Sequence, residues 1–245
     1  MDPDTEPAEK SLLIPGRFNG PPASANGGYT CGAAATLLGV RPAEVMLRRP
    51  PPLDTPMGVE REDGRIRLLE GGELVAEAAP IASVDVEVPE PVSPPLAHEA
   101  STRFPWREDH PFPTCFVCGP RRPDHDGLDL FAGSVEGRRE FACDWTPAAE
   151  WDRGDGAVRP EIVWAALDCP SAVGAAALVP GDPRPAVLAQ LAASLERAPA
   201  IHEPHAVIAW PIGRDGRKRW AGTAILDSDG EVCARARALW IELKS

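Results

Sequence analysis

Positive charge and long hydrophobic runs are both scarce in this sequence. The 245 residues include 25 Lys and Arg against 37 Asp and Glu, which gives a net charge of -12. Phosphate backbones are bound chiefly by clustered Lys and Arg, so this deficit argues against nucleic acid as a partner. The longest apolar runs, 33–40 and 172–179, are far too short to span a bilayer. We therefore expect neither a nucleic-acid partner nor a membrane partner.

Features of secretion are also missing. The first ten residues are acidic and contain proline, and they lack the basic and apolar regions of a signal peptide. Without such a signal, six cysteines in a chain of this size indicate reduced thiols and not a disulfide framework. The sequence therefore predicts a cytoplasmic protein with a disordered acidic tail over residues 1–10.

The chain contains an internal repeat. Residues 47–56, Leu-Arg-Arg-Pro-Pro-Pro-Leu-Asp-Thr-Pro, are echoed by 195–204, Leu-Glu-Arg-Ala-Pro-Ala-Ile-His-Glu-Pro, and 72–78 return as 230–236. Two copies of one unit are expected to pack as a pseudo-dimer, with a site at their junction. Proline is frequent between the copies, so we predict an extended, non-helical connector over 89–113 that separates an N-terminal domain (11–88) from a C-terminal one (114–245).

Each copy is predicted to hold one buried helix followed by strands. Residues 26–38 are almost wholly apolar and predict a helix that begins at two glycines. Residues 160–178 have the same character, with Pro160 at the first helical position and Pro170 expected to kink or split the helix after Asp168. Strands are predicted over 58–67, 73–79, 205–212, 218–226 and 231–243, with Asp-Gly and Gly-Gly turns. This pattern favours an α+β fold in which an antiparallel sheet curls around each helix.

The pattern resembles the hotdog fold, and the doubled unit resembles the single-chain double hotdogs of the acyl-CoA thioesterase superfamily. The similarity is carried by residues 18–29, by 47–56, by Cys-Phe-Val-Cys-Gly-Pro at 115–120 continuing to Gly-Leu at 127–128, and by Ala-Leu-Asp at 166–168. The resemblance implies two antiparallel sheets, each wrapped around a central apolar helix and fused as a pseudo-dimer. It also implies that the central helices lie side by side with an active site between the halves. The implied activity is acyl-thioester hydrolysis, with the acyl chain and the carrier, coenzyme A or acyl carrier protein, left open.

Thioester hydrolysis needs hydrogen-bond donors for an oxyanion and a base or nucleophile that brings in water. When Asn26 is aligned with Arg159, the first copy keeps two glycines and has no acid, whereas the second copy keeps the acid and has no glycines. The aligned pairs are Gly27 with Pro160, Gly28 with Glu161, and Ala35 with Asp168. We predict one composite site, with Asp168 as base or nucleophile, Gly27 and Gly28 as oxyanion donors, and Asn26 positioning the thioester or water. The mirror-related position should be inactive.

Each of these residues also has a structural interpretation. Asp168 could cap a helix that restarts after Pro170, the two glycines could serve only as a tight turn, and Asn26 is suited to be an N-cap whether or not it is catalytic. Further substrate contacts are expected from four side chains. They are Tyr29, Trp164, Arg217 and Lys218, of which the last two belong to a basic cluster that would suit a coenzyme A phosphate.

Cysteines raise two further possibilities. Cys115 and Cys118 have zinc-ligand spacing, and His110 or His125 could add ligands, but no second Cys-x-x-Cys pair follows. We therefore predict neither a metal nor a cofactor and favour buried thiols or a family-specific turn. Cys169 is disfavoured as a nucleophile because no histidine is near it in sequence.

Two rival functions stay open: a non-catalytic acyl-CoA binding or regulatory protein, and a hydratase or dehydratase. The latter is disfavoured because Phe18-Asn19 lacks the preceding histidine of such dehydratases and the first helix has no acid. Further homo-oligomerisation of the double unit is also left open.

Overall fold

The computed structural model describes residues 11–39, 42–123, 126–181 and 184–243. The helices are α1 (Gly27–Leu38), α2 (Pro94–Ser101) and α3 (Pro160–Ala176), with short 3-10 turns at Gly16–Phe18 and Ala149–Trp151. The strands are β1 (Ser11–Leu12), β2 (Ala43–Leu47), β3 (Met57–Glu62), β4 (Arg65–Glu70), β5 (Glu73–Pro80), β6 (Gly133–Ser134), β7 (Phe141–Trp145), β8 (Ala186–Leu195), β9 (His205–Asp215), β10 (Lys218–Leu226) and β11 (Val232–Glu242). The acidic tail predicted over 1–10 lies outside the described residues.

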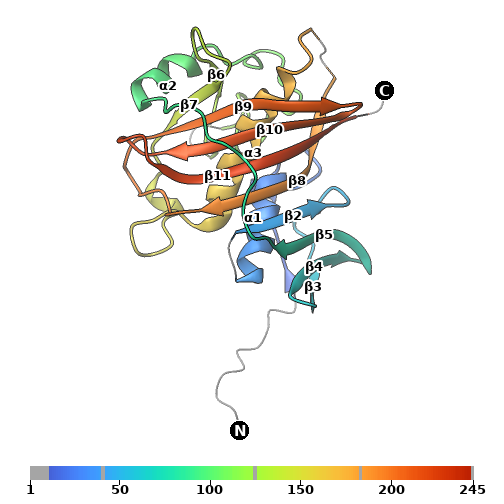
Figure 1. Ribbon diagram of the computed structural model, residues 1–245. Helices are drawn as coiled ribbons and strands as arrows, with labels where there is room; N and C mark the ends of the chain where they lie inside the picture. The colour runs from blue at the N-terminus through green and yellow to red at the C-terminus, as the bar shows by residue number, and fades with distance from the viewer. Residues whose placement is uncertain (1–10, 40–41, 124–125, 182–183, 244–245) are drawn as a thin grey trace.

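All the strands belong to one antiparallel, 11-stranded sheet in the order β1-β3-β4-β5-β2-β8-β11-β10-β9-β7-β6 (Figure 1). The two predicted sheets therefore meet edge to edge, and the seam is the pair β2–β8, in which Ala43 lies opposite Ala193. The predicted strands match β3 to β5 and β9 to β11, with a hairpin turn inside the predicted 58–67 strand. The seam strands β2 and β8 were not predicted as strands.

The two copies are related by a pseudo-two-fold axis at the seam. The order β3-β4-β5-β2 on one side repeats as β9-β10-β11-β8 on the other. Loop hydrogen bonds repeat as well: the Asn26 amide donates to the Phe18 carbonyl at 2.8 Å, and the Arg159 amide donates to the Trp151 carbonyl at 2.9 Å. Asn26 and Arg159 are the N-caps of α1 and α3. The sequence alignment of the two helices therefore corresponds to their positions in the fold.

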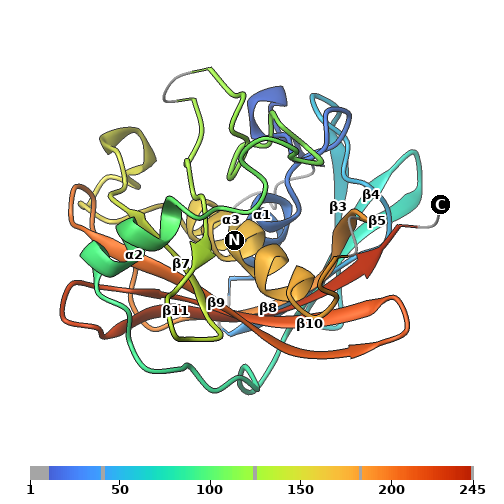
Figure 2. The ribbon, with the colours of Figure 1, turned by 90° about the horizontal axis from the view of Figure 1, so that it is seen from above.

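Helices α1 and α3 lie side by side against the concave face of the sheet (Figure 2). They run antiparallel, because Gly28 faces Asp168 whereas Gly32, one turn later, faces Glu161. The approach is close: a Cβ atom on Gly28 would lie 2.6 Å from the Trp164 carbonyl oxygen. Pro170 does not split α3, which is one helix from Pro160 to Ala176, so that part of the prediction is wrong.

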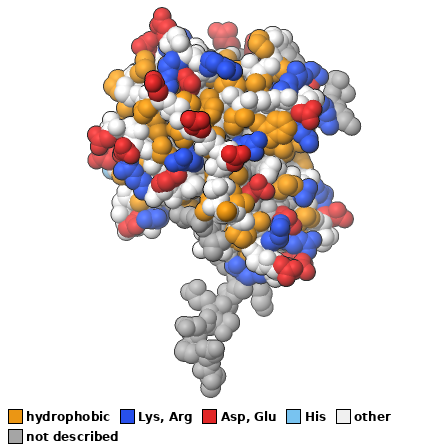
Figure 3. Space-filling model, in the orientation of Figure 1, with side chains coloured by type: hydrophobic (Ala, Val, Ile, Leu, Met, Phe, Trp, Pro, Cys, Tyr) orange, Lys and Arg blue, Asp and Glu red, His pale blue; other side chains and the backbone are white. Residues whose placement is uncertain are grey.

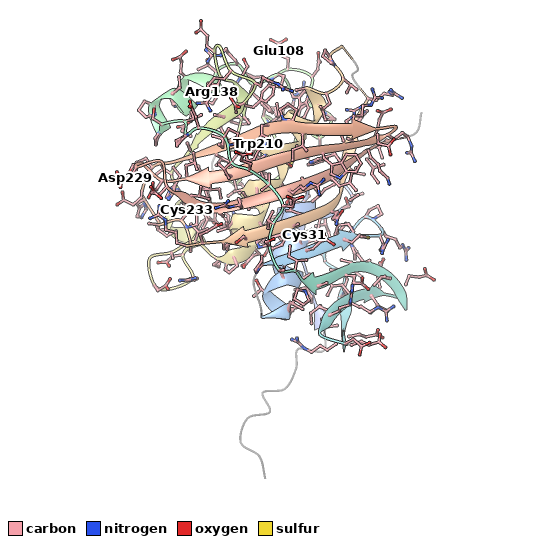
Figure 4. The ribbon with its side chains drawn as sticks, viewed as in Figure 1. Cys31, Glu108, Arg138, Trp210, Asp229 and Cys233 are labelled. Atoms are coloured by element: carbon pink, nitrogen blue, oxygen red, sulfur yellow. The ribbon has the colours of Figure 1, made fainter. Side chains whose placement is uncertain are left out.

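The connector between the copies crosses the opposite, convex face of the sheet in front of β9, β10 and β11 (Figure 1). Its Val86, Val88 and Val92 pack on outward-facing side chains of these strands, among them Trp210 of β9 (Figure 4). Arg138 fastens the connector by donating to the Pro91 carbonyl at 3.1 Å. On the face of the molecule that Figure 3 shows, hydrophobic side chains lie between acidic and basic ones.

The connector is not wholly extended, which corrects the prediction of a non-helical segment. Helix α2 begins at Pro94, because a proline at the first helical position loses no hydrogen bond, and it ends at Ser101. Its buried Ala97 and Ala100 belong to the same outer cluster as Val92. The domain boundaries at 88 and 113 stay a prediction.

Among the described residues, no helix combines the length and apolarity needed to cross a membrane. The cytoplasmic location stays a prediction.

Candidate functional site

The N-terminus of α1 consists of an asparagine cap followed by two glycines. Asn26 caps the helix: its side-chain Oδ1 accepts a hydrogen bond from the Tyr29 amide at 2.9 Å. Gly27 and Gly28 follow as the first two helical residues, so neither of them places a side chain over the helix terminus. The first-turn amides of α1 are therefore accessible wherever no other group accepts from them.

Asp168, from the middle of α3, reaches this helix terminus. Its Oδ2 accepts a hydrogen bond from the Gly28 amide at 2.8 Å, while its Oδ1 is buried and has no hydrogen-bond partner among the described residues. Burial is the main cause that raises the pKa of Asp168 to about 7, and the Gly28 hydrogen bond opposes it. One carboxyl oxygen is thus fixed by a hydrogen bond, and the other is buried without a hydrogen-bond partner among those residues. The carboxyl does not cap its own helix.

The amides of Gly27 and Gly28 differ in whether they have a hydrogen-bond acceptor. The Gly28 amide is occupied by Asp168. The Gly27 amide has no acceptor among the described residues, and Gly27 lines a cavity whereas Gly28 does not. The free hydrogen-bond donor at the positive end of the α1 dipole is therefore Gly27.

The cavity lies at the junction of the two copies and has a volume of about 560 Å³. That volume falls within the usual range for small-molecule sites, about 300–1,000 Å³. The first copy contributes Leu47 and Pro51, and the second copy contributes Leu188 and Trp240. Asn26, Gly27 and Asp168 lie together on its wall, so an apolar hollow opens onto the amide and the carboxyl.

Two basic residues line this cavity, and two others neighbour residues at or next to its lining. Arg48 and Arg49 line it and are exposed, and both follow β2 in the repeat motif. Arg217 and Lys218 do not line the cavity: the Arg217 Nη1 donates to the carbonyl of Glu242 at 2.8 Å, and Lys218 is paired in the sheet with the lining residue Ile241. Arg48 and Arg49 were not among the predicted site residues. The signal was their position in the repeated Leu-x-Arg segment, which was used only to detect the repeat.

Tyr29 and Trp164 are placed in the core and do not line the cavity. The Tyr29 ring stacks on Phe18 at 4.1 Å between ring centroids, and burial raises the pKa of Tyr29 to about 12. Trp164 is 2% exposed and packs where α3 meets Gly32. The predicted substrate contacts of these two side chains therefore receive no support from the shape of the cavity.

The mirror-related position lacks both reactive parts. At the start of α3, Pro160 has no amide hydrogen and Glu161 stands where Gly28 stands in α1. The counterpart of Asp168 is Ala35, a buried alanine. The mirror-related junction thus has no counterpart of the Gly27 N–H or of the Asp168 carboxyl.

Cys115 and Cys169 lie on the cavity wall as well, with their sulfur atoms 3.6 Å apart. A cysteine nucleophile would need a base, and the described residues that line the cavity include no histidine. His125, one of the two histidines considered as a zinc ligand, lies outside the described residues.

The fold is shared with known structures. No family model matches the chain, and no curated protein matches it. The TesB protein of Mycobacterium avium subspecies paratuberculosis is 13% identical, with 95% of this chain and 91% of that chain covered at a TM-score of 0.61. A candidate thioesterase from Novosphingobium aromaticivorans is 12% identical over 96% of this chain and 95% of that one, at 0.60.

A hotdog-fold protein of unknown function from Alicyclobacillus acidocaldarius is 12% identical over 96% of this chain and 93% of that chain, with a TM-score of 0.53. At such low identity these likenesses establish the fold alone. The predicted double hotdog architecture is confirmed.

Proposed function

We propose that this double hotdog protein is a thioester hydrolase that cleaves acyl-CoA at the composite site between its two halves. The observation that carries the proposal is the position of Asp168. Its carboxyl comes from the second copy, is fixed through one oxygen to the helix terminus of the first copy, and leaves the other oxygen unpartnered at an apolar cavity. Such a pairing of a carboxyl with a free amide supplies both requirements of thioester hydrolysis.

In the proposed reaction the acyl group enters the cavity with its carbonyl oxygen toward the Gly27 amide. Asp168 Oδ1 takes a proton from a water molecule, whose oxygen attacks the carbonyl carbon. The tetrahedral oxyanion is stabilised by the Gly27 N–H and by the dipole of α1. The intermediate then expels coenzyme A as its thiolate, which takes up the proton, and a carboxylic acid is released.

The rim fits a phosphorylated carrier. Arg48 and Arg49 on the cavity wall are cationic groups in a chain of net charge -12, and Arg217 and Lys218 are further cationic groups that neighbour Glu242 and Ile241. Guanidinium groups bind phosphate oxygens in a bidentate manner, so these residues are suited to the phosphates of coenzyme A. The acyl chain would extend inward between Leu47, Leu188 and Trp240.

A hydratase or dehydratase receives less support from the cavity. Such an enzyme needs an acid and a base that act on the acyl chain, and Asp168 is the single Asp, Glu or His among the described residues of the lining. The non-catalytic binding protein differs from the hydrolase only in whether thiol is released, so it is distinguished by assay.

The test is a panel of acyl-CoAs of different chain lengths, with the released thiol detected by a chromogenic disulfide reagent. We expect turnover with at least one member and a loss of about 10²–10⁴-fold in kcat for Asp168→Asn. Asparagine keeps the size of the side chain, and its carbonyl oxygen can still accept from the Gly28 amide. Acyl-CoA binding should therefore survive in this variant.

Asp144→Asn is the matched control, because Asp144 is an acid exposed on β7 with His98 as its partner. Its turnover should equal that of the unmodified protein. Wild-type turnover that persists unchanged in a folded Asp168→Asn variant would refute the assignment of the base. Binding of every acyl-CoA without thiol release would favour the regulatory alternative.

A further inference from the structure

Three cysteines from two distant parts of the chain meet beside the cavity. The sulfur atoms of Cys115, Cys118 and Cys169 all lie within 4.8 Å of one another, and all three side chains are buried. Cys115 and Cys118 come from one turn of the loop after α2, whereas Cys169 comes from α3. Three thiols that have no disulfide between them and share one small volume are the donor set preferred by a thiophilic metal ion.

The spacing of the sulfurs fits a single tetrahedral ion. With zinc–sulfur bonds of about 2.3 Å, tetrahedral angles place neighbouring sulfur atoms about 3.8 Å apart. The Cys115 and Cys169 sulfurs are 3.6 Å apart, and no pair in the cluster exceeds 4.8 Å. Small rotations of these side chains would bring all three sulfurs to zinc distance.

The loop that contains Cys115 and Cys118 forms a tight turn, as Cys-x-x-Cys loops of zinc sites do. The Gly119 amide donates to the Cys115 carbonyl at 2.9 Å, and Gly119 allows the turn to close because a Cβ there would lie 2.4 Å from the Cys115 nitrogen. This turn presents Cys115 and Cys118 with the Cys-x-x-Cys spacing of zinc ligands.

Two side chains supply hydrogen-bond donors to the sulfurs. The Nδ2 of Asn26 lies 3.9 Å from the Cys115 sulfur and 3.8 Å from the Cys169 sulfur. The Nε2 of His110 lies 3.3 Å from the Cys118 sulfur. Each cysteine of the cluster therefore has an N–H group directed at it, as the outer contacts of a metal–thiolate site do.

His110 is positioned as a hydrogen-bond donor and not as a ligand. Its Nδ1 accepts from the Phe112 amide at 2.9 Å and so carries no proton in the neutral ring. The proton is then on Nε2, which faces Cys118 and has no lone pair for a metal ion. The protein set is consequently three thiolates, and the fourth position opens toward the cavity that Cys115 and Cys169 line.

We propose that this chain binds one zinc ion through Cys115, Cys118 and Cys169, with the fourth coordination position facing the cavity. The site would fasten the loop of the second copy to α3 beside the terminus of α1. Binding proceeds by loss of the three thiol protons to solvent as three zinc–sulfur bonds form. The proposal goes beyond thioester hydrolysis and does not depend on it.

The test measures metal directly. The protein is expressed with zinc in the medium, purified with a phosphine reductant, and its metal content is measured by mass spectrometry. We expect one zinc ion per chain, with loss of stoichiometric zinc in Cys115→Ser, Cys118→Ser and Cys169→Ser. Cys233→Ser is the matched control, because Cys233 is a buried cysteine on β11 (Figure 4) that does not belong to the three-cysteine cluster, and this variant should keep its zinc.

Two results keep the test decisive if a variant misfolds. Replacement of zinc by cobalt(II) in the unmodified chain should give the intense thiolate-to-cobalt absorption and the visible bands of a tetrahedral site. His110→Gln should still bind one ion at saturation, with an affinity lowered by about 10–100-fold. The proposal is overturned by a zinc-free wild-type protein without the cobalt bands, by cysteine variants that retain zinc as Cys233→Ser does, or by loss of stoichiometry in His110→Gln.

Discussion

At the scale of single residues, Gly27 and Gly28 are neighbours of which only the second has an acceptor for its amide hydrogen among the described residues. Gly28 donates to Asp168 and also allows the helices to approach, whereas the Gly27 amide remains free at the cavity. In the second copy the position of Gly27 is taken by Pro160, which has no amide hydrogen. The chain thus contains its own example of a helix that begins correctly without this donor.

Gly27→Pro should remove the proposed oxyanion donor and keep the helix. Proline suits the first helical position, and Asn26 already has the extended backbone (φ -59°, ψ 132°) that proline requires of its predecessor. We expect kcat to fall by about 10²–10³-fold, the usual loss for one oxyanion donor. The measurement is steady-state thiol release.

Gly27→Ala is the matched control for that substitution. Its Cβ meets the side chains of Leu188 and Leu47 at 3.0–3.2 Å, as a proline ring carbon also would, but the amide hydrogen remains. Its kcat should lie much nearer to wild type. Equal losses in the two variants would attribute the effect to crowding and count against the amide.

The sequence alone indicated that the first copy has the glycines and the second copy has the acid, because the two copies of the repeat could be aligned. That alignment singled out Asp168 and the two glycines, and the structure brings Gly28 and Asp168 into contact. The alignment could not show that the Gly28 amide bonds Asp168 while the Gly27 amide lies at the cavity, because this depends on the register of two packed helices. It also could not join Cys169 to Cys115, since spacing within a motif says nothing of a contact between residues 54 positions apart.

At the scale of elements, the closeness of α1 and α3 sets the geometry of the site. Gly28 and Gly32 lie one turn apart on α1 and face the backbone of α3. A side chain at either position would push the helices apart and withdraw the carboxyl from the helix terminus. Glycine is therefore required here by contact and not by backbone conformation.

Gly32→Ala should destabilise the protein although alanine favours helices. The added Cβ would lie 2.6 Å from Glu161 Cα, a backbone atom that no side-chain rotation can move. Overpacking costs about 1–3 kcal/mol, which exceeds or cancels the gain in helix propensity of about 1 kcal/mol. We expect a lower urea midpoint. Gly213→Ala, with no atom within 4 Å of its Cβ, should leave the midpoint nearly unchanged; an equal change in both would argue against the close contact.

Element prediction failed where neighbours decide the structure. Strands β2 and β8 are short of β-branched residues, and Ala and Leu in them favour helix when considered alone. They are strands because each completes the sheet across the seam. Helix α2 was missed for another reason: the prolines taken as evidence for an extended chain stand at its first turn, where proline is favoured.

At the scale of the whole molecule, pseudo-symmetry with unequal halves predicts one site per chain. Calorimetric titration with a non-hydrolysable acyl-CoA thioether should give a stoichiometry of one, because the mirror-related position has Pro160, Glu161 and Ala35 in place of the reactive groups. Two equivalent binding events would contradict the asymmetric assignment. Asp168→Asn, which keeps the cavity, should give the same stoichiometry and serves as the control.

The connector that crosses the convex face limits how copies of this chain can associate. Val86, Val88 and Val92 already cover the apolar side chains that β9, β10 and β11 turn outward. Two copies could stack back to back over these strands only if the connector were first displaced. Its displacement would expose the apolar cluster to water, which is unfavourable. A homo-oligomer of this protein would therefore have to assemble through another surface, such as the β1 or β6 edge or the side of the loops.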